Sequence, residues 1–256
     1  MGKFDNKVVI VTGASSGIGA STAITFAREG AKVVVTGRNQ ERLNETSEKC
    51  KAVGAENFQI LEVVADLEKF KNLESLVKKT VDKFGGIDIL INNAGYARAE
   101  TIETIELDTY EKIFNANLRA PVFLCKYALP HLKKTKGCVV NVNSCASLTA
   151  GPGGVPYSMT KIALDHFTRG FSAECAPFGV RVNCVNPAAT DTRFGDNMNV
   201  TKEMFEKMLE SFMKRQPLGV IKPQQISDAI VFLCQSPVIT GINLPIDAGM
   251  LNAPAM

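Results

Sequence analysis

Tyr157 and Lys161 are the residues of this chain whose types and spacing most directly suggest chemistry. On a helix, residues four apart lie side by side on one face. A phenol that moves a proton at neutral pH needs its pKa lowered from about 10, and a nearby ammonium lowers it because it favours the phenolate. Ser144, thirteen residues before the tyrosine, could hold a carbonyl oxygen beside that phenol. These residues predict proton transfer to or from a carbonyl/alcohol pair.

The tyrosine and lysine are weak evidence alone, because four tyrosines and frequent lysines make a chance match common. The chemistry also needs a hydride donor, and a glycine-rich turn indicates one. Glycines allow the backbone to approach a phosphate, and the helix N-terminus that follows supplies free N–H groups and a positive dipole end. A turn of this kind between a first strand and a first helix predicts a dinucleotide site rather than a plain connection. After Thr12, its candidate binding residues are Gly13, Ser15, Ser16, Gly17, Ile18 and Gly19.

The end of the second predicted strand should face the adenosine ribose. An NAD site usually places a carboxylate there, but this chain has Arg38 and no acid before Glu41. An arginine can stack on adenine and pair with a 2′-phosphate. We therefore expect NADP(H) rather than NAD(H), with a solvent-facing arginine at a helix start as the alternative.

Apolar and helical segments alternate along the whole chain. The apolar runs are near-continuous, as in strands buried on both faces, and cover residues 7–11, 32–35, 58–64, 87–91, 138–142, 180–185 and 242–246. Helical patterns cover residues 18–28, 40–52, 70–84, 109–132, 156–176 and 224–233. The alternation predicts an α/β, doubly wound Rossmann fold, with a seven-stranded, mostly parallel sheet and helices on both faces. Residues 1–256 should form a single dinucleotide-binding and catalytic domain.

Residues 190–220 form a span longer than an ordinary loop, with a predicted helix at 201–215. The span is either a helix packed on the core or a mobile lid over an apolar substrate, and both can hold. The apolar stripe of this helix comprises Met204, Met208 and Phe212, flanked by Phe205, Leu209 and Met213.

Composition narrows the class of protein. With 45% hydrophobic residues and a net charge of +3, the chain reads as a soluble globular protein, and its charge gives no case for nucleic acid. No apolar run reaches membrane-spanning length, and the polar start lacks a signal peptide, so a cytoplasmic location is expected. Seven scattered cysteines without a CxxC argue against zinc and suit a reducing compartment. Cys145 is either a redox-sensitive thiol or a small packed residue.

Together these features resemble the short-chain dehydrogenase/reductase family, in its compact single-domain branch. The likeness covers essentially the whole chain and keeps the family's order. It rests on residues 12–19, Asp66, Asn92 to Gly95, Asn117, Ser144, Tyr157, Lys161 and Asn186–Pro187.

The resemblance implies catalytic roles. Tyr157 would be the general acid in reduction and the base in oxidation. Lys161 would lower the phenol pKa and bond the nicotinamide ribose, and Ser144 would orient the substrate oxygen. Asn117 would help hold a water chain that carries protons from Lys161 to solvent. The alternatives for Asn117 and Ser144 are structural roles.

The resemblance also implies cofactor contacts. Asp66 and Leu67 would flank the adenine, although Asp66 could also cap a helix. The adenosine ribose would lie over Asn93, Ala94 and Gly95. The nicotinamide would be held after the sixth strand, by Pro187, Ala188, Thr190 and Thr192. Ala188 replaces the family's usual glycine and Thr190 its usual Val or Ile, which bears on the carboxamide site.

The expected activity is therefore that of an NADP-dependent carbonyl reductase, reversible and without a metal. The alternative from another class is a non-catalytic dinucleotide-sensing or scaffold protein, which the retained tyrosine and lysine disfavour. A sugar-nucleotide epimerase is disfavoured by the glycine spacing. Phe194 and Met198 suggest an apolar substrate, whereas Arg98 and Arg193 could receive an anionic one. The resemblance further implies a homo-oligomer, tetramer or dimer, formed through the helices at 109–132 and 156–176.

Overall fold

Seven strands form one sheet in the computed structural model, which describes residues 2–55, 58–198 and 201–253. The order is β3-β2-β1-β4-β5-β6-β7, and every neighbouring pair is parallel. The predicted fold class is thereby confirmed. The strands are β1 Val8–Thr12, β2 Lys32–Gly37, β3 Ile60–Val64, β4 Ile89–Asn92, β5 Cys138–Val142, β6 Arg181–Pro187 and β7 Asn243–Ile246.

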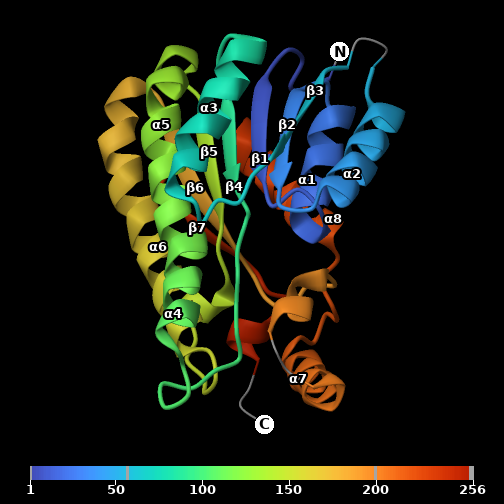
Figure 1. Ribbon diagram of the computed structural model, residues 1–256, viewed down its shortest axis with the longest axis vertical. Coiled ribbons are helices and arrows are strands. Elements are labelled where there is room, and N and C mark those ends of the chain that lie inside the picture. Colours follow the sequence, from blue (N-terminus) through green and yellow to red (C-terminus); the bar gives the residue numbers. More distant parts are fainter. Residues whose placement is uncertain (1, 56–57, 199–200, 254–256) are drawn as a thin grey trace.

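Helices cover both faces of this sheet (Figure 1). On one face α1 and α8 supply Phe26 and Ile230 to a first buried cluster. On the other face α3, α5 and α6 supply Leu73, Leu124 and Phe171 to a second. The helices are α1 Gly17–Arg28, α2 Gln40–Val53, α3 Phe70–Phe84, α4 Leu107–Phe114, α5 Ala120–Thr135, α6 Val155–Cys175, α7 Lys202–Arg215 and α8 Pro223–Gln235.

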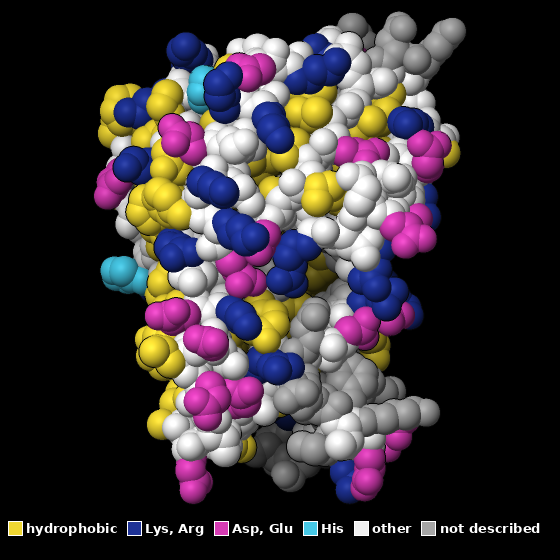
Figure 2. All heavy atoms as spheres, viewed as in Figure 1, with side chains coloured by type: hydrophobic (Ala, Val, Ile, Leu, Met, Phe, Trp, Pro, Cys, Tyr) yellow, Lys and Arg dark blue, Asp and Glu magenta, His cyan; other side chains and the backbone are white. Residues whose placement is uncertain are grey.

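The strand order reverses direction at β1, which pairs with β2 on one side and β4 on the other. Successive crossovers leave this point on opposite faces, so a crevice opens beyond the carboxyl ends of these strands. Helices α4 and α7 extend the molecule at that end (Figure 1). Figure 2 shows one face with basic and acidic side chains intermixed, and it is hollowed near its centre.

One helix prediction was wrong in detail. The pattern at 109–132 predicts a single helix, but a π-helical turn, Asn115–Arg119, separates α4 from α5. A π turn adds one residue to a turn without breaking the helix, and such turns are frequent at functional sites. Apolar periodicity does not reveal one extra residue in a turn, so the π turn was invisible in the sequence.

Helix α7 lies close to its predicted place, at Lys202–Arg215. The apolar stripe predicted on it, Met204, Met208, Phe212, Phe205, Leu209 and Met213, lies outside the side chains that the structure describes. In the described part of the chain, no helix combines the length and apolar character needed to cross a membrane. Within the same residues, no three metal-ligating side chains gather into a possible metal site.

Candidate active site

The glycine turn follows β1 directly and packs against the segment after β4. Gly13 and Gly17 have φ of 63° and 55°, a left-handed conformation that favours glycine. A β-carbon at Gly13 would lie 2.9 Å from the Ala94 Cα. Helix α1 begins at Gly17, and the Ser16 side chain before it makes no capping hydrogen bond. The first-turn N–H groups therefore remain available to an anion such as a pyrophosphate.

Thr12 and Asn93 hold this turn to the end of β4. The Thr12 hydroxyl accepts hydrogen bonds from the backbone N–H groups of Asn93 and Ala94, at 2.9 and 3.0 Å. The Asn93 side chain donates to the carbonyls of Thr12 and Gly13, at 2.8 and 3.2 Å. The Asn93 amide thus braces the two loops that meet at the crevice.

Arg38 lies at the predicted position beyond β2, with 58% of its side chain exposed. Its Nη1 is 3.3 Å from the Glu68 Oε1, so the guanidinium is shared with a carboxylate. Burial raises the pKa of Glu68, and the charge of Asp66 raises it further, while Arg38 lowers it. Arg119 donates to the Glu68 carbonyl from the π turn and fixes that residue in place.

Asp66 lies in the segment between β3 and α3. Its Oδ1 accepts from the backbone N–H of Glu68 at 3.1 Å, which forms a tight turn after β3. The N-cap of α3 is Lys69, so the alternative of Asp66 as an N-cap was wrong. Leu67 beside it is buried. The turn brings the Glu68 carboxylate to Arg38, just beyond β2.

Tyr157 and Lys161 lie in the first two turns of α6, and the Lys161 Nζ is 5.5 Å from the phenol ring centre. Ser144 caps the short helix that follows β5, where its Oγ accepts from the Ala146 N–H at 3.1 Å. The Ser144 side chain is also near enough to the phenol of Tyr157 to lower its pKa. From residues 190–220, the Phe194 ring packs 5.9 Å from the tyrosine ring. Three separate segments therefore meet at the phenol.

Burial controls both titrating groups. Desolvation raises the pKa of Tyr157 to about 12, and the Ser144 hydrogen bond offsets part of that rise. Desolvation lowers the pKa of Lys161 to about 8, partly offset by Cys184 and by the negative charge of Asp165. The rise at Tyr157 is opposite to the lowering expected from Lys161, whose Nζ donates instead to the Val142 carbonyl at 3.1 Å. In this arrangement the phenol is protonated at neutral pH, which is the proton-donating form.

Asn117 lies in the π turn and is fully buried. Its Oδ1 accepts from the Tyr96 N–H and its Nδ2 donates to the Tyr96 carbonyl, both at 2.8 Å. The Nδ2 also lies 3.2 Å from the hydroxyl of Thr160, next to Lys161. The π turn thus lets one amide tie the segment after β4 to α6.

The segment after β6 crosses above the start of α1. Ala188 has a negative φ, so its β-carbon costs no backbone strain. Thr190 donates to the Ala188 carbonyl at 3.0 Å, and the Thr192 side chain lies about 3.0 Å from where a Gly17 β-carbon would be. A cavity of about 490 Å³ opens there, lined in part by Ser16, Gly17, Asp191, Thr192 and Arg193.

Gln216 is a site residue that the pattern did not suggest. Its buried side chain accepts from the Ala189 N–H at 2.9 Å and donates to the Ala189 carbonyl at 3.2 Å. It also donates to the carbonyl of Gly219 at 3.1 Å. Gln216 therefore anchors the far end of the span at 190–220 to its start. A lone glutamine after a helix gives no local signal of such a contact.

Cys145 and the two arginines considered for an anionic substrate are the remaining candidates. Cys145 is buried, its thiol donates to the Asn186 carbonyl at 3.1 Å, and burial raises its pKa to about 12, so the packed reading is favoured over a redox-sensitive one. Arg193 is 2.9 Å from Asp196, and Arg98 is 3.8 Å from Glu100. Both arginines considered for an anionic substrate thus have carboxylates beside them.

Comparison with known proteins agrees with this geometry. A family model described as short chain dehydrogenase matches residues 7–203. Meso-2,3-butanediol dehydrogenase of Serratia marcescens is 32% identical over 250 residues, which cover 96% of this chain and 95% of that protein.

Two solved structures share the fold closely. A Caenorhabditis elegans short-chain dehydrogenase/reductase of unknown function, with cofactor, superimposes with a TM-score of 0.90 at 37% identity, covering 96% of each chain. A 3-ketoacyl-(acyl-carrier-protein) reductase from Brucella melitensis, complexed with NADH, gives 0.87 at 29% identity, covering 97% of this chain and 100% of that one. The chain therefore belongs to the short-chain dehydrogenase/reductase family, whose members are oxidoreductases that act on alcohols or carbonyls with a nicotinamide cofactor.

Proposed function

We propose that this protein is an NADP(H)-dependent reductase of a ketone or aldehyde, with Tyr157 as the proton donor. The observation that carries the proposal is the meeting of three segments at the phenol. Ser144 reaches it from the end of β5, Lys161 from the next turn of α6, and Phe194 from residues 190–220. A hydroxyl pair and an ammonium in a desolvated site suit a developing alkoxide.

The residues at the crevice fit a nicotinamide dinucleotide, because glycine packing and an uncapped helix N-terminus leave a cradle for phosphates. When bound, the nicotinamide supplies the hydride in reduction and accepts it in oxidation. The Ser144 and Tyr157 hydroxyls donate to the substrate oxygen, and Tyr157 gives up its proton as charge develops there. Lys161 then stabilises the phenolate. Asn117 holds the segment after β4 against α6, next to Lys161. Reversal of these steps requires the phenol to be deprotonated, so oxidation is favoured at higher pH.

The preference for NADP(H) rests on Arg38 and is opposed by two observations. Glu68 shares the guanidinium, and one relative was solved with NADH. We keep NADP(H) because a 2′-phosphate brings two negative charges to Arg38 and can displace one partly exposed carboxylate. The comparison of kcat/KM with NADPH and NADH tests this directly. Arg38→Asp should move the ratio toward NADH by tenfold or more, and a wild-type preference for NADH would exclude the assignment.

The substrate pocket should lie between residues 94–100, 145–155 and 190–220. Leu148 and Val155 are exposed apolar side chains on the second of these segments. They support an apolar carbonyl substrate. We assign residues 190–220 as the lid of the single catalytic domain, tied to the loop after β4 by the hydrogen bond from Ala99 N–H to the Met198 carbonyl, at 3.0 Å.

A panel of carbonyl compounds with NADPH, followed by absorbance, tests the activity. Butane-2,3-dione and a 3-oxoacyl thioester correspond to the named relatives, and an aromatic ketone tests the apolar pocket. Turnover of at least one supports the proposal. Tight NADPH binding without turnover of any would favour the alternative, a non-catalytic dinucleotide sensor or scaffold.

We also propose a homo-oligomer formed through α5 and α6. Ile162 and Met159 on α6 are 52% and 44% exposed, and Phe178 just after it is 47% exposed. Apolar side chains of this size on one helix suit burial against a second copy. Light scattering after size exclusion should give the mass of a dimer or tetramer, and a monomer would contradict the proposal.

A further inference from the structure

Asp165 is a buried carboxylate one helical turn beyond Lys161, on the same face of α6. Only 4% of each residue is exposed. The Asp165 Oδ1 accepts hydrogen bonds from the Asn143 amide and, at 3.3 Å each, from the Asn186 amide and the Cys184 thiol. A carboxylate at this depth is costly unless its charge is compensated.

The two amides connect Asp165 to the catalytic residues. Asn143 stands between Val142, whose carbonyl accepts from Lys161, and Ser144. The same Asn143 amide donates to the Lys161 carbonyl at 3.0 Å. Asn186 donates to the Ser144 carbonyl at 3.3 Å. One carboxylate therefore anchors the carboxyl ends of both β5 and β6 under the site.

The groups facing Asp165 are neutral donors, apart from Lys161. Burial raises the pKa of Cys184, so its thiol carries no charge at neutral pH. The titratable groups around Lys161 are Tyr157 and Asp165 on α6 and Cys184 on β6. Desolvation lowers the pKa of the lysine, and negative charge at Cys184 or at Asp165 raises it. Because the Cys184 thiol is neutral, the carboxylate of Asp165 is the charge that does so. Asp165 is thus a buried negative charge one helical turn from a desolvated ammonium.

We propose that Asp165 is a positioning residue of the enzyme. It holds Lys161 in its charged form, and it fixes the end of β5, which carries Ser144 and the Val142 carbonyl that accepts from Lys161. It acts through Lys161, so this inference rests on the proposed function. Sequence reasoning passed over Asp165 because an aspartate in the middle of a helix usually faces solvent.

Asp165→Asn separates the charge from the shape. The amide keeps an oxygen for Asn143, Asn186 and Cys184, while the negative charge is lost. Without that charge both Lys161 and Tyr157 should release their protons at lower pH, by about one pH unit. With the fastest substrate of the panel, the alkaline limb of kcat/KM for reduction should shift to lower pH. The acidic limb for oxidation should shift in the same direction.

This paired shift distinguishes positioning through charge from simple structural damage. A structural defect would lower both rates at every pH and leave the midpoints unchanged, and that result would overturn the proposal. Cys184→Ser is the matched control, since it alters the same buried network, retains a donor and leaves the carboxylate. It should keep both wild-type midpoints. If Asp165→Asn does not fold, Asp165→Ser provides a smaller neutral side chain for the same test. Asp165→Glu retains the negative charge, so its pH profiles should have the wild-type midpoints.

A substrate-independent measurement keeps this inference separable from the function. Carbon-13 labelling of lysine Cε allows the Lys161 titration to be followed by NMR, with its signal identified by its loss in Lys161→Met. Asp165→Asn should lower that titration midpoint, and an unchanged midpoint would refute the inference. If Lys161→Met retained full activity, the proposed function would fail while the effect of Asp165 on the lysine could still hold.

Discussion

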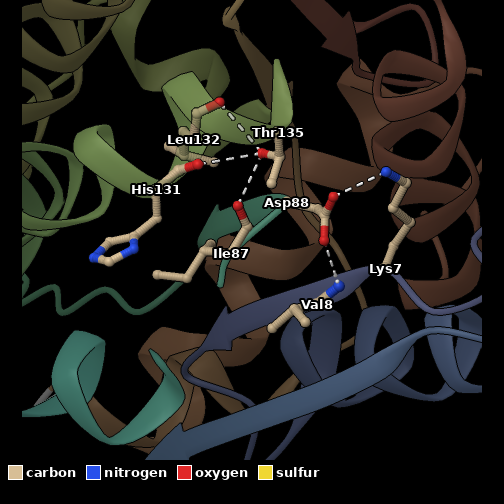
Figure 3. A network of polar contacts seen from close by, with 7 residues as sticks. All are labelled: Lys7, Val8, Ile87, Asp88, His131, Leu132 and Thr135. Carbon is tan, nitrogen blue, oxygen red and sulfur yellow. Dashed lines mark hydrogen bonds and ion pairs between the residues drawn. The ribbon is translucent and has the colours of Figure 1, made fainter. Parts of the chain in front are cut away.

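The two ends of the parallel strands carry polar networks of different character. We call the side where the strands begin the amino edge and the side where they end the carboxyl edge. At the amino edge, Asp88 before β4 accepts from the Lys7 Nζ and from the Val8 N–H, each at 2.9 Å (Figure 3). Thr135 at the end of α5 donates to the Ile87 carbonyl at 3.0 Å in the same view. At the carboxyl edge, Lys161, Asp165 and Asn117 are buried and linked across several segments.

The difference follows from the direction of the helices. Where strands begin, helices end, and their last carbonyls are closed by left-handed residues such as Gly85 after α3 and Lys136 after α5. Where strands end, helices begin, and α1 and α6 start without a side-chain cap. Free N–H groups and positive dipole ends therefore gather at the carboxyl edge. The backbone groups at the amino edge are satisfied within the protein, whereas those at the carboxyl edge remain available to bind reactants.

Removing the phenol hydroxyl should produce the largest effect and act only on the carboxyl edge. Tyr157→Phe should lower kcat by 10²- to 10⁴-fold, about the contribution of a general acid, because the proton donor is lost while the ring still packs on Phe194. NADPH binding, followed by fluorescence, and the thermal midpoint should stay close to wild type. Activity within a few fold of wild type would break the assignment of chemistry to this edge.

The pH dependence should come from the same edge. The pKa of Lys161 is about 8, so its ammonium is present below that pH and lost above it. Because the charged lysine supports proton donation, kcat/KM for reduction should be constant at neutral pH. It should then fall, approaching tenfold per pH unit, once the pH exceeds about 8. A rate that is flat from pH 7 to 10 would show that no group near this value controls the step.

The amino edge should respond in stability rather than activity. Asp88→Ala leaves the Val8 N–H without its partner and should lower the free energy of unfolding by about 2 kcal/mol, measured by urea denaturation. Because Asp88 lies at the opposite edge from the site, kcat/KM of the folded variant should match wild type. A large loss of kcat/KM at temperatures where the variant is folded would mean that the two edges are coupled.

The smallest effect should come from the other half of the same ion pair. The Lys7 side chain is 50% exposed, and such pairs contribute about 0–1 kcal/mol. Lys7→Ala should therefore cost well under half of what Asp88→Ala costs, and its effect should shrink further in high salt. Equal losses in the two variants would show that the ion pair, and not the backbone hydrogen bond, stabilises this edge.

The amino-acid sequence determined the order of strands and helices, the glycine turn and the neighbouring Tyr157 and Lys161, because each of these follows from residue type at short spacing. Only the tertiary structure decided the π turn at Asn117, the pairing of Arg38 with Glu68, the anchor at Gln216 and the burial of Asp165. Each depends on a partner distant in the chain or on one extra residue in a helical turn. Local periodicity indicates neither the distant partner nor the extra residue. The same pattern also suits an ordinary helix with its polar side chains in solvent.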